Sequence, residues 1–444
     1  MFYIDNETTK DLEIFSFEKK KASLIECFKK TNFLGGYDKI QEIFSSPTND
    51  LQELTDRQEI IRFFTKFHLS FESSREDLDY IEYYLISTIE PLRTSNKVSF
   101  LLEAIAYRLL VKRVYDYNVI SLAKVVRFLH DVRKILEELS VIQVPSALRS
   151  HMEKAATILE KRLLKRLASQ KVRKRLFFVK LFAYDSDLRL KYHQDIKMLL
   201  QIMYMLDAFS TIARVAEERG MSLPLFKETD TPALEMEGVV HPFLTDPVSN
   251  DLRLGDGRNM IFLTGPNMAG KTTLLKSIGI SVFMAHLGLP VPCRNMRLSI
   301  FNGLITNINT ADNLKIGYSY YYSEVKRVKS VAEKFRDNRK MVWIGDELFR
   351  GTNIKDAYDA SKLIVTSFAR VKDSIMIISS HLVELAKEID AIPTITFQQM
   401  KTLVKDGEPQ FTYTMSEGVS DIRLGLYILK KEGIEEIITE CLRD

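Results

Sequence analysis

One stretch of the sequence constrains the fold more than any other part of the chain. The apolar run Met260–Thr264 leads into the loop Gly265-Pro-Asn-Met-Ala-Gly270, and a helical pattern starts at Lys271. This order, an apolar strand, a GxxxxGK[ST] loop and a helix, is typical of a phosphate-binding loop. Glycines let backbone N–H groups turn inward around phosphates, and the helix N-terminus adds its positive dipole end. A chance glycine-rich turn is the alternative.

The chemistry assigns a role to each residue type in this loop. Lys271 can reach the β- and γ-phosphates, and the Thr272 hydroxyl is placed to bind Mg²⁺. The sequence therefore predicts a nucleoside triphosphate site. The residues predicted to contact the nucleotide here are Gly265, Pro266, Asn267, Met268, Ala269, Gly270, Lys271, Thr272 and Thr273.

Two further apolar strands end in polar residues. The first, residues 341–347, ends at the adjacent carboxylates Asp346 and Glu347, and the second, residues 374–381, ends at His381. We expect Asp346 to hold Mg²⁺, Glu347 to polarise the attacking water, and His381 to contact the γ-phosphate or that water. A solvated turn and a structural histidine are the plainer alternatives. Helical patterns separate the three strands, which indicates a parallel sheet with its ligand at the strand C-termini.

At this level of detail the residues resemble a known family. The segment Gly265-Pro-Asn-Met-Ala-Gly-Lys-Thr272 is more restrictive than the general loop and resembles the nucleotide-binding signature of MutS-type mismatch repair ATPases. Further segments are similar to other parts of that family's core and ATPase domains. These are residues 4–14, 56–58, 241–243, 250–252, 317–324, 346–353 and 415–427.

The resemblance implies an ABC-superfamily ATPase that works as a homodimer with ATP and Mg²⁺. In such a dimer Ser319 would complete the nucleotide site of the neighbouring subunit, and Val248 and Asn250 would lie at the base. Three departures stand out. Tyr320 and Tyr321 follow Ser319 where the family usually has Thr-Phe, Pro247 and Val248 stand where it often has an aromatic residue, and Phe349 replaces a common glycine.

Absences shape the expected function as much as the motifs do. The sequence begins directly with the segment that resembles the MutS core domain, so we expect a short form with core and ATPase domains only. The triplet Phe226-Lys-Glu228 looks like a mismatch-reading wedge but precedes the ATPase segment, and we interpret it as chance. The clamp that normally interrupts the core is expected to be missing or shortened. Mismatch recognition by the usual wedge is therefore not expected.

Composition and patterning predict two domains of different class in this 444-residue chain. Residues 1–225 have apolar residues at helical spacing and predict a helical, core/lever-like bundle; residues 226–444 predict an α/β, P-loop ATPase domain with a mainly parallel sheet. The three cysteines are scattered and fit a reducing cytoplasm. The most apolar window, Met198 to Val215, is interrupted by Asp207 and Arg214, so we expect a cytoplasmic protein without membrane contact.

A local basic cluster in the helical part suggests contact with nucleic acid. Lysines and arginines gather between residues 161 and 180 without an acidic residue among them, although the net charge of the chain is only +4. We expect DNA backbone contacts from Lys165, Arg166, Lys171, Arg173, Lys174 and Arg175. A solvated basic face, or one paired with acidic helices, is the equal alternative.

The sequence thus predicts an ATP-dependent DNA-binding protein of MutS type, in which ATP hydrolysis opens and closes a dimer on duplex, mismatched or branched DNA in repair or recombination. The alternative is a nucleotide-gated interaction protein whose partner is a protein or a ribosome-like RNA assembly; a partner protein could also supply recognition. A transporter ATPase is disfavoured because no LSGGQ-type signature precedes the acidic strand, and a nucleotide kinase because no acceptor-binding lid is evident.

Overall fold

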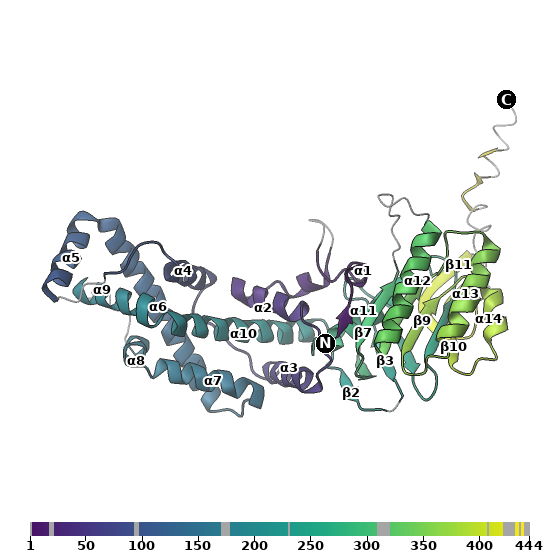
Figure 1. The fold of residues 1–444 in the computed structure, drawn as a ribbon, viewed down its shortest axis with the longest axis horizontal. Helices are drawn as coiled ribbons and strands as arrows, with labels where there is room; N and C mark the ends of the chain where they lie inside the picture. Colours follow the sequence, from purple (N-terminus) through teal and green to yellow (C-terminus); the bar gives the residue numbers. More distant parts are fainter. Residues whose placement is uncertain are drawn as a thin grey trace. The chain divides into compact units, whose positions relative to one another are not determined.

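The computed structural model divides the chain into two compact units. It describes residues 2–16, 22–92, 97–169, 178–229, 231–308, 320–405, 408–420, 431–434 and 437–438. The α/β unit comprises Met1–Glu26, Ser46–Leu54 and Glu218–Asp444, and the helical unit comprises Cys27–Ser45 and Thr55–Glu217 (Figure 1).

The α/β unit is built on a seven-stranded sheet that is mainly parallel. The strand order is β1-β7-β8-β9-β5-β10-β11, and only the pairing of β10 with β11 is antiparallel. In this order the strands are Tyr3–Ile4, Gly303–Asn307, Met341–Asp346, Ile375–Ser379, Met260–Thr264, Ile395–Lys405 and Glu408–Glu417. The strands predicted around residues 260, 341 and 374 are therefore β5, β8 and β9, which lie side by side at the centre of the sheet.

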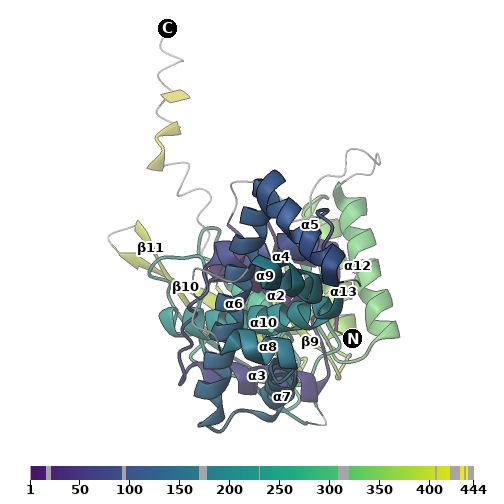
Figure 2. The same cartoon turned by 90° about the vertical axis from the view of Figure 1, so that its left-hand side faces the viewer.

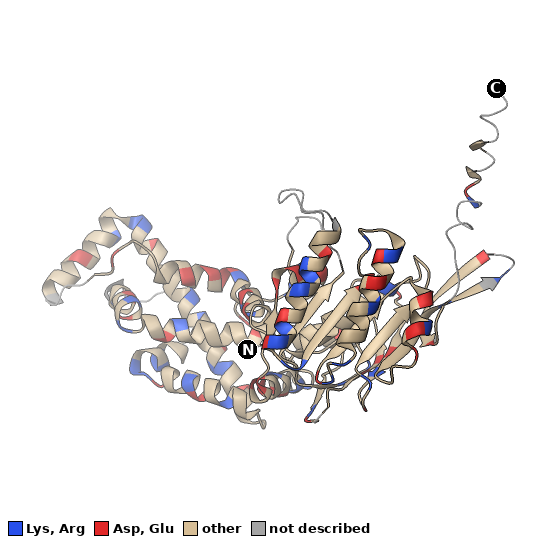
Figure 3. Ribbon diagram, turned by 45° about the vertical axis from the view of Figure 1, so that its right-hand side comes forward, with Lys and Arg blue, Asp and Glu red and all other residues tan. Residues whose placement is uncertain are grey.

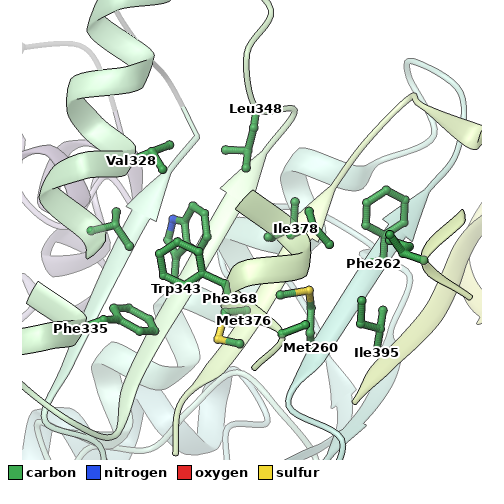
Figure 4. Packing of buried hydrophobic residues seen from close by; sticks show 14 of the residues in the cluster. Met260, Phe262, Val328, Phe335, Trp343, Leu348, Phe368, Met376, Ile378 and Ile395 are labelled. Carbon is green, nitrogen blue, oxygen red and sulfur yellow. The ribbon is translucent and has the colours of Figure 1, made fainter. Parts of the chain in front are cut away.

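Helices cover the two faces of this sheet, as successive strand residues point to opposite sides. On one face α12 (Tyr320–Asp337), α13 (Ile354–Phe368) and α14 (Val383–Ile389) pack on Trp343 and Met376 (Figure 4). The Trp343 ring lies 4.6 Å from that of Phe368 on α13. On the other face Ile344 meets α11 (Lys271–Ala285) near Gly279. Burial on both faces explains why these strands read as continuous apolar runs.

A smaller four-stranded sheet completes the α/β unit. Its order is β2-β6-β3-β4, with bounds Leu225–Lys227, Asn295–Ser299, Leu234–Val239 and Asn250–Leu254. The register of β3 and β4 shifts between Met236 and Val239, where Gly238 has a φ of 64° and its N–H donates to Asp251 Oδ1 at 2.6 Å. This bulge bends β3 at the point where the chain leaves it toward residues 240–249.

The first residues of the chain belong to the α/β unit, which differs from the predicted division into 1–225 and 226–444. β1 pairs in parallel with β7, and α1 (Asn6–Asp11) packs on the same strand. Arg327 of α12 forms ion pairs with Asp5 and Glu7, while the Asp11 carboxylate accepts hydrogen bonds from Thr306 and Ile308. Pairing over this sequence distance leaves no local signal in the residues, so a boundary placed by composition misses it.

The helical unit agrees with the predicted bundle in its secondary structure. Its main helices are α2 (Leu34–Phe44), α4 (Arg75–Leu85), α5 (Lys97–Leu110), α6 (Lys112–Ser140), α7 (Ser146–Leu159), α8 (Arg162–Ala168), α9 (Phe178–Ser186) and α10 (His193–Glu218). The 3₁₀ helix η1 (Leu24–Phe28), α3 (Leu51–Phe64) and the π-helical turn η2 (Asp187–Lys191) complete the described helices. Figure 2 shows α4 on one side of α10 and α7 and α8 on the other.

Buried carboxylates fix the starts of helices in this unit. Asp207 of α10 accepts hydrogen bonds from the backbone N–H groups of Asn32 and Phe33, which precede α2. A Cβ at Gly36 would lie 2.2 Å from Asp207 Oδ2, so only glycine allows α2 to approach α10 this closely. Asp131 of α6 accepts from the N–H groups of Glu72 and Ser73 just before α4. Such bonds satisfy donors that a helix N-terminus leaves free.

Helix α10 is long and apolar enough to cross a membrane, but it is a core helix in this structure. Its most apolar window is 78% buried inside the protein. The window corresponds to the apolar segment noted in the sequence, and its Asp207 is buried because it forms the helix-start contacts described above. Burial of the helix within the bundle accounts for its hydropathy.

Candidate active site

The loop between β5 and α11 contains residues with left-handed backbone conformations. Gly270, the residue before α11, has a φ of 92°, which is the left-handed region that favours glycine. Met268 also has a positive φ, 69°, and its side chain is exposed. No side chain caps the first turn of α11. Its N–H groups and positive dipole end are therefore directed toward the loop, as the sequence predicted.

Lys271 lies at the centre of the site and is nearly buried. Its Nζ donates to the carbonyl oxygens of Gly265 at 2.9 Å and Pro266 at 3.2 Å, and lies 3.4 Å from Glu347 Oε1. His381 Nε2 is also 3.4 Å away. Burial lowers the pKa of Lys271, against the opposing effect of the Glu347 and Asp346 carboxylates. The carbonyl oxygens of the loop thus hold the Lys271 side chain in place. In the predicted site, the loop and this side chain would bind phosphate together.

The two residues predicted to bind the metal are in direct contact. Thr272 Oγ1 donates to Asp346 Oδ2 at 2.6 Å, and Ser379 donates to Asp346 Oδ1. Asp346 is the last residue of β8 and is buried, whereas the Thr272 side chain is exposed toward the cavity described below. The contact joins the start of α11 to the end of β8. It places a hydroxyl and a carboxylate, both hard oxygen donors, on one side of the cavity.

This oxygen pair fits Mg²⁺ bound together with a nucleotide. Mg²⁺ is held through one or two protein oxygens, with substrate phosphates and water filling the octahedron. Within the described ranges, no group of three His, Cys, Asp or Glu side chains is close enough to hold a metal ion by itself. The donors Thr272 and Asp346 therefore suit a metal that arrives with phosphate.

Glu347 is surrounded by basic side chains. His381 Nε2 pairs with Glu347 Oε1, and Arg350 Nε lies 3.0 Å from Glu347 Oε2. Burial alone would raise the pKa of the Glu347 carboxyl, but the His381 hydrogen bond and the charges of His381, Arg350 and Lys271 outweigh burial and lower it. Glu347 is thus a carboxylate at neutral pH. Its backbone is in the left-handed region, with a φ of 53°, and its N–H donates to the Ser379 carbonyl at 3.1 Å.

A cavity of about 500 Å³ opens beside these residues. Loop 266–273 and Glu347 line it together with residues 239–250, Met400 and Tyr413, and the Tyr413 ring lies beside Gly270. The lining residues are Val239, Val240, His241, Leu244, Asp246, Pro247, Val248, Asn250, Pro266, Asn267, Met268, Gly270, Lys271, Thr272, Thr273, Leu274, Ser277, Glu347, Met400 and Tyr413. The lining combines polar groups of the loop with apolar and aromatic side chains, a mixture that suits a ligand with both phosphates and a planar base.

Val248 and Asn250 both line this cavity, as predicted, but Asn250 has a further task. Its Nδ2 donates to the Tyr413 carbonyl at 3.0 Å, and its Oδ1 accepts from Met415 N–H at 2.5 Å. Asn250 therefore ties β4 to β11. Tyr413, which this tie holds at the cavity wall, supplies an aromatic ring that Pro247 and Val248 lack.

Some predicted site residues lie outside the described residues. Ser319 is one of them, as are Lys171, Arg173, Lys174 and Arg175. The described part of the basic cluster is at least partly paired with acids. Lys165 lies 2.6 Å from Glu160, and Lys161 lies 2.6 Å from Asp195. Lys165 and Arg166 lie on the exposed face of α8. Figure 3 shows basic and acidic residues mixed over this unit, which favours a solvated face for the described portion.

Three residues of the site were not predicted from the sequence. Arg350 bridges both carboxylates, Glu324 supports the backbone at Arg350, and Tyr413 closes the cavity. Arg350 lies in segment 346–353, directly after the acidic pair, and this position was the feature of the sequence that could have indicated its role. Glu324 likewise ends the noted segment 317–324, although no role was assigned to it, whereas Tyr413 lies outside every noted segment and had no signal of its own.

The amino-acid sequence is similar to those of known proteins. Residues 261–443 match the family model described as MutS domain V. The chain is 30% identical over 252 residues to the DNA mismatch repair protein MutS of Bacillus subtilis, a match that covers 55% of this chain and 29% of that protein. It is 28% identical over 240 residues to the MutS of Shouchella clausii, covering 53% and 27%.

A plant protein shows the same similarity. The DNA mismatch repair protein MSH7 of Arabidopsis thaliana is 29% identical over 237 residues, which cover 48% of this chain and 21% of that protein. In each of these three comparisons the matched segment spans less than a third of the relative.

Proposed function

We propose, from the premise that this chain belongs to the MutS family, that its α/β unit binds ATP with Mg²⁺ and hydrolyses it, and that hydrolysis controls the grip of a dimer on DNA. The observation that carries the ATPase proposal is the 2.6 Å contact between Thr272 Oγ1 and Asp346 Oδ2. It joins the end of β8 to the first turn of α11, where a phosphate-bound magnesium ion needs a hydroxyl and a carboxylate together.

The chemistry assigned to each residue follows from its surroundings. Lys271 and the N–H groups of the loop bind the β- and γ-phosphates. Thr272 and Asp346 would hold Mg²⁺, which would neutralise negative charge on the phosphates. Glu347 accepts the proton of the attacking water, and His381 contacts the γ-phosphate or that water. The same cavity receives the base, with Val248, Asn250 and Tyr413 among its lining residues.

The ion pairs of Glu347 suggest how phosphate binding activates it. Lys271, Arg350 and His381 all pair with this carboxylate in the structure. The γ-phosphate is an anion that competes for the same basic side chains. As they turn toward phosphate, the influences that lower the pKa of Glu347 weaken and its pKa rises, so it becomes a stronger base when substrate is in place.

A Lys271→Ala variant tests the nucleotide site. A charge-assisted hydrogen bond is worth about 1.5–3 kcal/mol, so we expect ATP affinity to fall roughly 10- to 100-fold. Isothermal titration measures the affinity, and Lys329→Ala, an exposed substitution on α12, serves as the control. Unchanged affinity in Lys271→Ala would remove the loop from the nucleotide site.

We further propose that the protein acts as a homodimer in the cytoplasm, with Ser319 of one subunit completing the site of the other. A single subunit leaves one side of the γ-phosphate open to water, and closure by a second subunit excludes it. ATP binding closes the two subunits and hydrolysis releases them. The proposed substrate of this cycle is duplex, mismatched or branched DNA in repair or recombination, held by backbone contacts.

The DNA proposal is tested by charge reversal in the basic cluster. Reversing Lys171, Arg173, Lys174 and Arg175 should weaken binding to all DNA forms alike, and the salt slope should fall by about 0.9 for each lost phosphate contact. The charge-matched control reverses four lysines that are exposed on the α/β unit, Lys329, Lys355, Lys387 and Lys401.

A competition experiment compares the DNA forms. Homoduplex, mismatched duplex and four-way junction compete for the protein with and without ATP at one salt concentration, which ranks their affinities. No binding to any of them would favour the alternative, a nucleotide-gated protein that acts on a protein or ribosome/RNA partner.

A further inference from the structure

A buried carboxylate on α12 has no part in the chemistry assigned above. Glu324 is 2% exposed. Its Oε1 accepts a hydrogen bond from Arg350 N–H at 3.2 Å, and its Oε2 accepts one from Gly351 N–H at 3.1 Å. Both oxygens thus bind the backbone of the turn that follows the acidic pair. Burying a carboxylate is costly unless its oxygens accept hydrogen bonds. The turn must therefore keep the backbone position that supplies these bonds to Glu324 of α12.

The turn needs such support because its backbone is unusual. Glu347 and Phe349 have φ values of 53° and 63°, a region that side-chain-bearing residues rarely adopt. The Phe349 ring is buried and lies 5.9 Å from that of Tyr321, in the first turn of α12. One turn of α12 therefore holds Phe349 by its ring and the next holds Arg350 and Gly351 by their amides.

The side chain that this turn presents is Arg350. Its Nε lies 3.0 Å from Glu347 Oε2, and its guanidinium is 3.6 Å from Asp346 Oδ2. The amide of Arg350 is one of the two that Glu324 binds. Glu324 therefore fixes the point on the backbone from which the guanidinium reaches both carboxylates of the site.

We propose that Glu324 is a positioning residue for ATP hydrolysis, which holds the turn at Arg350 so that the guanidinium orients Glu347 and faces the γ-phosphate. The inference rests on the proposed ATPase function. It assigns Glu324 an effect on the hydrolysis rate and little effect on nucleotide affinity, because Glu324 binds the amides of Arg350 and Gly351, in the turn after the acidic pair.

Steady-state ATP hydrolysis by Glu324→Ala and Glu324→Gln tests this role. We expect Glu324→Ala to lower kcat by about 10- to 100-fold while KM changes less than about threefold, because misplacement of a catalytic group mainly affects the chemical step. Glu324→Gln keeps the volume and one acceptor oxygen, so it should recover part of the loss. Glu333→Gln, a half-exposed position on α12, is the control. A wild-type kcat in Glu324→Ala would overturn the proposal, as would an equal loss in the Glu333 control.

A double-variant cycle separates positioning from general damage. If Glu324 acts through Arg350, adding Glu324→Ala to Arg350→Ala should lower kcat by less than about twofold further. The full loss in both backgrounds would contradict a role through Arg350. Thermal unfolding of each variant shows whether it is folded, and Glu324→Gln carries the test if Glu324→Ala is not.

Hydrogen exchange provides a readout that does not depend on turnover. The amides of Arg350 and Gly351 should exchange faster in Glu324→Ala than in the unmodified protein, because they lose their acceptor. Unchanged exchange would show that Glu324 does not hold this turn, even if ATP hydrolysis is normal. Absence of turnover in the unmodified protein would instead remove the proposed function and the role in hydrolysis, while exchange still decides whether Glu324 holds the turn.

Discussion

Phe349 occupies a backbone conformation that usually belongs to glycine. An L-residue in the left-handed region costs about 1–2 kcal/mol, yet here the ring is buried beside Tyr321 and packs in the core under α12. The departure noted in the sequence, phenylalanine in place of a glycine, is therefore resolved by packing. The gain from burying an aromatic side chain exceeds the strain of its backbone.

This balance predicts an unusual order of stability. Phe349→Ala and Phe349→Gly both lose the ring, at a cost of roughly 3–5 kcal/mol. Only Phe349→Gly also relieves the strain, so we expect it to be more stable than Phe349→Ala by about 1 kcal/mol. Denaturant unfolding measures the difference. At Lys355 in helix α13 the order should be reversed, since glycine costs about 1 kcal/mol relative to alanine there. An alanine variant of Phe349 as stable as the glycine variant would contradict the account.

The site residues that could be predicted from the sequence are those that belong to a motif or end an apolar strand. Lys271, Thr272, Asp346, Glu347 and His381 were predicted to act together, and the structure brings all five within one network. Their convergence follows from lying at the ends of adjacent parallel strands or at the start of the following helix. Arg350 was not assigned a role, because the motif does not indicate in which direction the side chain of a turn residue extends. The ligand contacts themselves stay predictions.

Among the elements, the central strands were the most predictable. Burial on both faces makes β5, β8 and β9 continuous apolar runs, and β5 has the predicted bounds Met260–Thr264. The pairing of β1 with β7 and the tie between Asn250 and β11 were not predictable. They join segments far apart in the chain, and each depends on tertiary packing rather than on local propensity.

The end of α11 offers a prediction on pH at the scale of elements. His286 is fully buried between Phe2, Phe226 and Phe301, and its Nε2 accepts a hydrogen bond from Phe301 N–H at 3.0 Å. It thereby joins α11 to the start of β7, to β2 and to the chain N-terminus. Burial lowers the pKa of His286 from 6.5 to about 4.

This lowered pKa makes neutral His286 part of the folded state. The unfolded chain takes up the proton first as the pH falls, so the contribution is complete above about pH 6.5 and is lost toward pH 4. We expect the stability advantage of the unmodified protein over His286→Gln to shrink by roughly 3 kcal/mol over this window, at about 1.4 kcal/mol per pKa unit. Unfolding in urea at several pH values measures it. An advantage that does not change with pH would show that His286 is not held neutral.

For the whole molecule, the path of the chain bears on how nucleotide state could reach a partner. The chain passes between the helical unit and the α/β unit after Glu26, Ser45, Leu54 and Glu217. The first crossing follows the segment that Arg327 of α12 holds through Asp5, and α12 also carries Glu324. We propose that these connections transmit a change at the proposed nucleotide site to the helical unit, where DNA binding is proposed.

We propose that this molecule is an ATPase with Glu347 as its general base, and single-turnover hydrolysis by Glu347→Gln is the sharpest test of that role. Removing a general base costs about 100- to 10,000-fold in rate. We expect at least a 100-fold loss relative to the unmodified protein, with ATP affinity kept within a few-fold, because phosphate binding depends on Lys271 and the loop. Glu333→Gln should hydrolyse ATP normally. Hydrolysis by Glu347→Gln at the unmodified rate would contradict the account.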